Sequence, residues 1–352
     1  MSNKITRVGI SQGDINGIAY ELILKTFEDS RMYELCMPVL FGSSKALAFH
    51  RKAMELPQIN TSIINDSKDI GSNRLNIVHS SQEEVAVELS KPTEAAKKIA
   101  YQAVDYAINE LDKRNIDVLV TTPSTIEECS CFEKTFNKKP LEILVHESFR
   151  IALATGKIPL SEVPASLSIE GLSTQLKTLH EVLIKDFMIT TPRIAVLSFN
   201  PGISLKEQTL GVEEKEIIIP AIEQASSKGV ICFGPYAADN FFASDEYMKF
   251  DAVLAMYYDQ GVISFRSITG DEGVHYYANL PYVITSPDQD VSFEKAGTNT
   301  CSPDSMRQAI YLALNIHKNR IIDHRITANP LRKQYFERGS DNEKLDLTKE
   351  ED

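Results

Sequence analysis

Two apolar runs in the last third of the chain end in side chains that could hold a polar ligand. The run Ala252–Met256 leads into Tyr257, Tyr258, Asp259, Gln260 and Gly261, and the run Leu280–Ile284 leads into Thr285, Ser286, Pro287 and Asp288. Apolar runs of this length are typical of buried strands in a parallel sheet, whose two faces are covered by helices. Because open α/β sheets bind ligands at the carboxyl ends of their strands, we expect both runs to deliver polar groups to one rim.

A second candidate site is the turn that follows the first predicted strand, Ile5–Ile10. The turn contains Gly13, Asp14 and Gly17 and leads into a predicted helix. Backbone N–H groups at a helix N-terminus favour an anion or a polar substrate. The pattern is not GxGxxG, and an interpretation in which the glycines serve only a tight strand-to-helix turn stays equally open.

These candidate sites must be positioned by an alternation of strands and helices that continues through most of the chain. The stretch Thr93–Lys113 places alanine, isoleucine, valine and leucine on one face of a long helix, which predicts packing against a core. The stretch Asp117–Val120 is predicted to be a buried strand. The stretch Glu128–Pro140 is predicted to be irregular, and its Cys129 and Cys131 have no further metal ligands beside them. The alternation predicts an α/β fold.

Composition and charge exclude several classes of partner. The chain has 352 residues and a formal net charge of −12, and no cluster of lysine and arginine with interleaved aromatic residues. Nucleic-acid binding needs a basic face, so a nucleic-acid partner is not expected. The five cysteines are odd in number and never spaced as CxxC, which favours a reducing compartment. With no signal segment and no run of membrane-spanning length, we expect a cytoplasmic protein without a membrane partner.

Six blocks of sequence together carry a resemblance to a known family. They are GDINGIAYE at Gly13–Glu21, ATGKIPLSEV at Ala154–Val163, AVLSFNPG at Ala195–Gly202, GPYAAD at Gly234–Asp239, FDAVLAMYYDQG at Phe250–Gly261 and TSPD at Thr285–Asp288. In order and spacing they resemble the 4-hydroxythreonine-4-phosphate dehydrogenase family of pyridoxal phosphate biosynthesis. The resemblance implies an isocitrate/isopropylmalate dehydrogenase-like α/β fold and a homodimer. It also implies NAD-dependent oxidation of a secondary alcohol, followed by decarboxylation.

The resemblance also sets the expected domain organisation. It extends over about Ile5–Phe336 and implies a single family domain, residues 1–337, made of two lobes with a central cleft. Residues 338–352 are acidic and poor in apolar groups. A segment of this composition cannot bury enough apolar surface to fold, so it is predicted to be a disordered tail.

The family's metal site is where this sequence departs most from the pattern. The resemblance implies three histidines that hold a divalent metal, and their positions here carry Lys157, Gly202 and Tyr258. Lysine is a cation at neutral pH, glycine has no ligand atom, and a neutral tyrosine is a poor ligand. A divalent metal is therefore not expected, whereas NAD stays possible as the family's cofactor.

The substrate-binding positions implied by the family are also altered. Its lysine, asparagine and arginine correspond to Arg266, His275 and Ile284, and its PGHTE block has no counterpart near Asn137–Leu141. An aliphatic side chain cannot bind a carboxylate or phosphate as arginine does. The remaining substrate-binding candidates are Asp14, Asn200, Gln260, Arg266 and His275.

Three functions are compatible with this pattern. The one we favour is a non-catalytic homologue that keeps the fold and the dimer and binds a small-molecule ligand or acts in regulation. A second is an active dehydrogenase whose metal is held in another way. The third is a metal-free oxidoreductase acting on a phosphorylated hydroxy-amino acid or a related hydroxy acid.

For the third function the catalytic candidates are Lys157, Tyr258 and Asp259. Lys157 would supply the positive charge that the metal gives in the family. Tyr258 would act as general base, with its pKa lowered by the neighbouring ammonium group.

Overall fold

A single twelve-stranded sheet runs through the whole molecule in the computed structural model, which describes residues 5–83, 85–202 and 211–328. In spatial order its strands are β3 (Thr61–Ile63), β4 (Leu75–Val78), β2 (Cys36–Phe41), β1 (Thr6–Ser11), β5 (Val118–Val120), β12 (Val283–Pro287), β11 (Val274–Ala278), β6 (Leu141–His146), β7 (Phe149–Leu153), β10 (Ala252–Ala255), β8 (Ile194–Leu197) and β9 (Cys232–Tyr236). The mixed α/β fold predicted from the sequence is confirmed.

Helices cover the sheet and follow its strands in the chain. They are α1 (Ala19–Glu28), α2 (Met32–Leu35), α3 (Ser44–Ala53), α4 (Glu94–Asp112), α5 (Glu128–Phe136), α6 (Val163–Ser166), α7 (Ile169–Lys185), α8 (Ile219–Ser227), α9 (Ala238–Ala243), α10 (Tyr258–Thr269) and α11 (Asp304–Thr327). Short 3-10 or π turns are η1 (Leu160–Glu162), η2 (Glu214–Ile218), η3 (Glu246–Lys249) and η4 (Phe293–Lys295).

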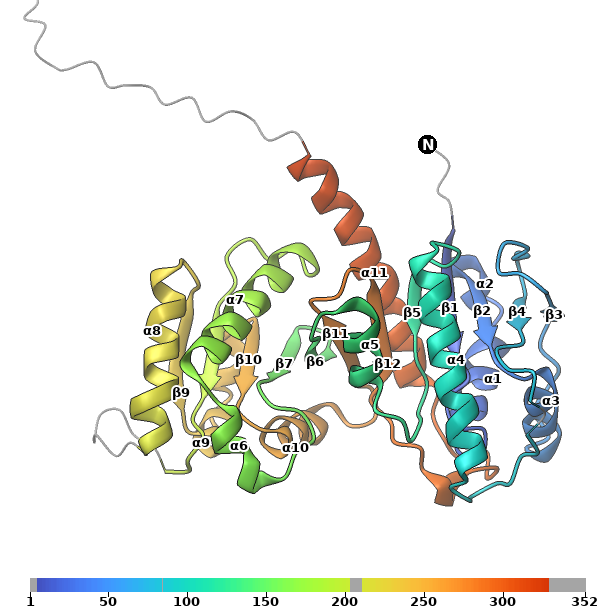
Figure 1. The fold of residues 1–352 in the computed structure, drawn as a ribbon, viewed down its shortest axis with the longest axis horizontal. Helices are drawn as coiled ribbons and strands as arrows, with labels where there is room; N and C mark the ends of the chain where they lie inside the picture. Colours follow the sequence, from blue (N-terminus) through green and yellow to red (C-terminus); the bar gives the residue numbers. More distant parts are fainter. Residues whose placement is uncertain (1–4, 84, 203–210, 329–352) are drawn as a thin grey trace, which may run out of the picture.

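The pairing of the strands divides the sheet into two parallel blocks. The first block runs from β3 to β12, and the second runs from β7 to β9. Between them β11 and β6 pair antiparallel with each other and with their neighbours. In Figure 1 the two blocks form two lobes, with α1 to α4 on one and α6 to α9 on the other. Helices α5 and α11 lie near the junction between the lobes.

The strands and helices form for the physical reasons that the sequence indicated. The strands β5 and β10 are buried apolar segments, and β1 is buried from Val8 to Ser11, as expected where both faces of a parallel sheet are covered. The long helix α4 buries the predicted alanine-rich stripe, and its N-cap residue Thr93 accepts a hydrogen bond from the Ala96 N–H at 3.2 Å. The predicted packing role of this helix is thus confirmed.

Two local predictions were wrong, and one strand was missed. The stretch predicted to be irregular forms helix α5, which ends at Asn137 in a left-handed conformation with φ of 49°. Strand β11 was not predicted, because its tyrosines and histidine interrupt the apolar pattern. Strand β12 begins at Val283 and includes the polar residues through Pro287, since pairing with β5 and β11 continues past the apolar run.

The remaining large-scale predictions are not decided by the fold. No helix of the described residues is both long enough and apolar enough to cross a bilayer. The predicted acidic tail, residues 338–352, lies outside the described residues. The homodimer predicted from the family stays a prediction.

Candidate binding cleft

A cleft of about 930 Å³ lies where the two lobes meet, and its walls come from elements far apart in the chain. The loops after β5, β7 and β12 contribute to it, together with the start of α5, helix α10 and the antiparallel strands β6 and β11. The described lining comprises residues 122–129, Glu142, 156–157, Tyr258, Arg266, His275, Tyr277, 286–287 and 289–294.

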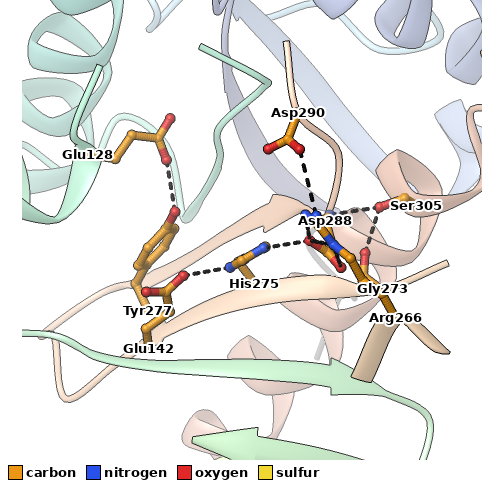
Figure 2. Close-up of polar contacts among 9 residues, drawn as sticks. All are labelled: Glu128, Glu142, Arg266, Gly273, His275, Tyr277, Asp288, Asp290 and Ser305. Carbon is orange, nitrogen blue, oxygen red and sulfur yellow. Dashed lines mark hydrogen bonds and ion pairs between the residues drawn. The ribbon is translucent and has the colours of Figure 1, made fainter. Parts of the chain in front are cut away.

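A buried carboxylate, Asp288, bonds to two residues of the cleft lining, Arg266 and His275. Its side chain is 0% exposed and accepts hydrogen bonds from Arg266, at 2.6 Å from Nη2 and 3.1 Å from Nε, and from His275 Nε2 at 2.8 Å. Burial alone would raise the pKa of Asp288, but the bonds from His275 and Arg266 hold that pKa well below its usual range. Asp288 is therefore ionised and holds two cations together (Figure 2).

The backbone of Asp288 is fixed as firmly as its side chain. The Asp288 N–H donates to Ser305 Oγ and to the Gly273 carbonyl, each at 2.9 Å, and Ser305 Oγ donates to the same carbonyl at 2.6 Å. These bonds tie the end of β12 to the start of α11 and to the residue before β11. The position of Asp288 is thus set by three elements at once.

His275 extends the network toward the other wall of the cleft. Its Nδ1 lies 2.6 Å from Glu142 Oε1, while its Nε2 lies 2.8 Å from Asp288 Oδ1. Because both ring nitrogens face carboxylate oxygens, both must carry a hydrogen. Burial alone would lower the pKa of His275, but bonding to Asp288 and Glu142 raises that pKa to about 9. At neutral pH the ring is an imidazolium between two carboxylates.

We expect this arrangement to make stability fall as the pH rises above neutrality. His275 has a folded-state pKa of about 9 and an unfolded-state pKa of about 6.5. Its contribution to stability is therefore complete below about pH 6.5 and is lost as the pH rises to about 9. Urea unfolding should show this loss in the wild type and a smaller one in His275→Gln; equal pH dependence in both proteins would contradict the assignment.

Lys157 and Tyr258, two of the predicted catalytic candidates, lie together in the cleft. The Lys157 Nζ lies 5.1 Å from the centre of the Tyr258 ring, within the range of a cation–π contact. The predicted net lowering of the pKa of Tyr258 was wrong, although Lys157 acts on that pKa in the predicted direction. Burial raises the pKa of Tyr258, and the opposing effect of the ammonium group does not overcome it. Tyr258 therefore keeps its proton at neutral pH.

Glu128 is a carboxyl group that sequence reasoning did not single out. It lies in the first turn of α5, is only 9% exposed, and lines the cleft. Its Oε2 accepts hydrogen bonds from Thr121 Oγ1 at 2.7 Å and from the Tyr277 hydroxyl at 3.1 Å. Burial raises the pKa of Glu128 to about 7, although the hydroxyl donors oppose the shift. Glu128 can therefore exchange a proton near neutral pH.

The other predicted site residues make local contacts outside the described cleft lining. Gln260 accepts from the Met256 N–H at 2.8 Å and donates to the Ser198 carbonyl at 2.7 Å. Asn200 donates from Nδ2 to Glu213 and Glu214, at 2.8 and 2.9 Å. These amides hold loops together, and their predicted role in substrate binding stays untested.

The two predicted carboxylates lie in contrasting surroundings. Asp14 is buried after β1 and accepts from the Asn16 N–H at 2.9 Å, and its backbone N–H donates to the Pro123 carbonyl at 3.0 Å. Gly13 precedes it with φ of +63°, where a Cβ would collide with Thr122 and Pro123. The glycine thus lets the turn after β1 approach a loop of the cleft. Asp259 is exposed at the start of α10.

The three positions that the resemblance assigns to metal ligands do not fit a divalent cation. Lys157 presents an ammonium group, Gly202 has no side chain and Tyr258 keeps its phenolic proton. Among residues 5–83, 85–202 and 211–328 there is no group of three or more histidine, cysteine or acidic side chains arranged to hold a metal ion. A ligand in the cleft would instead meet Lys157 and the partly exposed Arg266.

Comparison with known proteins agrees with the resemblance seen in the sequence blocks. The family model of the pyridoxal phosphate biosynthetic protein PdxA matches residues 34–313. The chain is 45% identical to a 4-hydroxythreonine-4-phosphate dehydrogenase of Bacteroides thetaiotaomicron, over 98% of each chain. This chain belongs to the PdxA family. A second relative with the same name, from Prosthecochloris aestuarii, is 31% identical over 89% of this chain and 97% of its own.

Solved PdxA-type structures share the fold. A 4-hydroxythreonine-4-phosphate dehydrogenase from Klebsiella pneumoniae superposes with a TM-score of 0.75 at 22% identity, covering 90% of this chain and 99% of that one. A second, from Burkholderia phymatum, gives 0.71 at 22% identity, covering 89% and 99%. The PdxA family relationship supports an oxidoreductase role, and these structures support the fold.

The residues that sequence reasoning missed are acidic partners of those it found. Glu142 was not selected, and Asp288 was named only among the polar residues at a strand end, although both bond to the selected His275. Glu128 was assigned to an irregular stretch, so its place at the start of a helix was not seen. Two signals were available in the sequence: Asp288 directly follows a strand, and Glu127 and Glu128 stand at the N-terminus of α5, where acidic residues are favoured.

Proposed function

We propose that this PdxA homologue binds an anionic small molecule in the cleft without the family's metal-dependent oxidation and decarboxylation. The observation that carries the proposal is the contact between Lys157 and Tyr258, at two positions that the resemblance assigns to metal ligands. Burial alone would lower the pKa of Lys157, but the contact with Tyr258 raises that pKa, so the ammonium form is favoured. Within the described chain, Lys157 forms no ion pair with a carboxylate, which leaves its charge available to a ligand.

The chemistry of the cleft supports a phosphorylated or carboxylated ligand. Lys157 and Arg266 both line it, and ammonium and guanidinium groups bind carboxylates and phosphates through charge-assisted hydrogen bonds. The related enzymes are named for 4-hydroxythreonine 4-phosphate, which makes that compound the first ligand to test. NAD, expected from the family, is included in the same assay.

A second candidate function is a metal-free oxidoreductase. The close approach of Lys157 to Tyr258 favours it, because an ammonium group beside a protonated phenol can hydrogen-bond and stabilise the oxygen of a substrate alcohol or ketone. In this role Tyr258 would act as hydrogen-bond donor, since its raised pKa makes it a weak base at neutral pH. NAD would accept the hydride, and the hydroxyl proton would be released to water.

The test is a binding and turnover assay of the purified protein. We expect 4-hydroxythreonine 4-phosphate to raise the thermal midpoint, Lys157→Met to weaken its binding by roughly tenfold or more, and no NADH to form with or without zinc or manganese. Lys185→Met, which removes an exposed lysine of α7, is the matched control. Metal-dependent NADH formation would overturn the proposal, while metal-free formation lost in Tyr258→Phe would establish the second candidate.

A further inference from the structure

Glu128 is a buried acid that forms no ion pair with a cationic side chain of the described chain. Its hydrogen-bond donors are three hydroxyl groups, those of Thr121, Tyr277 and, at the longer distance of 3.5 Å, Ser124. A buried carboxylate without a positive partner is costly, and burial accordingly raises the pKa of this group to about 7. A glutamine of the same shape would avoid the cost, so the charge of Glu128 calls for a separate reason.

The two oxygens of Glu128 differ in how fully they are bonded. Oε2 accepts the two shorter bonds, from Thr121 at 2.7 Å and from Tyr277 at 3.1 Å. Oε1 has only the 3.5 Å contact with Ser124. In Figure 2 the Tyr277 bond reaches one oxygen while the other points away from it. Oε1 can therefore accept further hydrogen bonds. Because Glu128 lines the cleft, a ligand there could donate them.

We propose that Glu128 Oε1 binds the ammonium group of a ligand that also carries an anionic group, which lies toward Lys157 and Arg266. The proposal rests on the proposed ligand-binding function of the cleft. The ligand ammonium supplies the direct ion pair that Glu128 lacks in the described chain. On binding, a neutral Glu128 releases its proton to solvent, and the carboxylate that remains pairs with the ammonium.

The surroundings of Glu128 contain other groups that titrate or carry charge. His275 is an imidazolium up to about pH 9 and favours the ionised form of Glu128, whereas the raised pKa of Tyr277 keeps that phenol neutral. Other titratable or charged groups face Glu128 or share its cleft. They are Glu127 and Cys129 at the start of α5, Glu142 of β6, His275 and Tyr277 of β11, Asp290 and Glu294 after β12, and Lys157, Tyr258 and Arg266.

The test compares two ligands that differ only in whether they carry an ammonium group. O-phospho-L-serine has an ammonium group where 3-phospho-L-glycerate has a hydroxyl, so titration of their shared phosphate largely cancels in the ratio of affinities. We expect the wild type to prefer phosphoserine, and the preference to grow roughly tenfold between about pH 6 and about pH 8, as Glu128 ionises. Calorimetry over this range measures both affinities.

Matched variants separate Glu128 from the remaining acids. Glu128→Gln keeps an oxygen for Thr121 and Tyr277 but cannot ionise, so the preference for phosphoserine should fall by roughly tenfold or more and lose its pH dependence. Glu133→Gln, an exposed residue of the same helix, makes the same charge change outside the cleft and should behave as the wild type.

The results that would contradict the Glu128 assignment differ from those that would contradict the proposed binding function. A wild-type preference that does not change with pH, or one that Glu128→Gln retains, would overturn the assignment to Glu128 while leaving anion binding in place. Failure of both ligands to bind the wild type at any pH would overturn the proposed binding function and this assignment with it.

Discussion

Replacing Asp288 with asparagine should lower the free energy of unfolding by about 3–5 kcal/mol, the range observed when one partner of a buried ion pair is removed. The side chain of Asp288 is 0% exposed and accepts hydrogen bonds from both Arg266 and His275. Asparagine has one acceptor oxygen and turns an N–H donor toward the second cation. Urea unfolding at neutral pH measures the loss as a lower midpoint at unchanged slope.

The neighbouring carboxylate provides a matched control for this prediction. Asp290 is 70% exposed and lies 3.6 Å from Arg266 Nη1, so Asp290→Asn should change stability by less than about 1 kcal/mol. If Asp288→Asn were as mild as Asp290→Asn, Asp288 would not be the group that holds the two cations together.

Replacing Glu128 with glutamine should increase stability at alkaline pH by up to about 3 kcal/mol, the equivalent of the shift from about 4.5 to about 7. In the folded protein Glu128 stays protonated up to about pH 7, whereas in the unfolded chain it ionises above about pH 4.5. Folding of the wild type therefore takes up a proton between these values, and stability falls as the pH rises through them. Glutamine does not titrate, so the variant avoids this loss.

The comparison is made by urea unfolding at about pH 5 and about pH 8. The advantage of Glu128→Gln over the wild type should be small at the lower pH and large at the higher one. Glu133→Gln, with the same change of charge at an exposed site of α5, should show no such growth. A variant less stable than the wild type at about pH 8 would mean that Glu128 is stabilised as a carboxylate by contacts other than these hydroxyls.

Glu128 thus links stability to ligand binding. Glu128 lowers stability when it ionises, and its Oε1 can accept a further hydrogen bond in the cleft. Carboxyl groups with such shifted pKa values are typical of functional sites. If the two Glu128 experiments agree, the stability lost to its charge is recovered when a ligand ammonium binds. The increase in thermal midpoint produced by phosphoserine should then be smaller in Glu128→Gln.

The sequence by itself determined the fold class, the PdxA family and part of the site. Apolar runs followed by polar residues identified the strand ends, because burial of both sheet faces leaves that pattern in the chain. The sequence blocks pointed to Lys157 and Tyr258 as neighbours, although they are far apart in the chain, and the two lie in contact. They also pointed to Arg266 and His275, which line the same cleft.

Only the tertiary structure decided how these groups are paired and which of them hold a proton. Glu142 lies 133 positions from His275 in the chain, and their contact exists because β6 pairs antiparallel with β11. The pKa of Tyr258 is raised, contrary to the sequence-based prediction, because burial outweighs the nearby charge. The place of Glu128 in the cleft follows from helix α5, which puts its carboxyl group beside the Tyr277 hydroxyl. Burial and contacts between distant segments set these properties, and neither is encoded in the local order of residues.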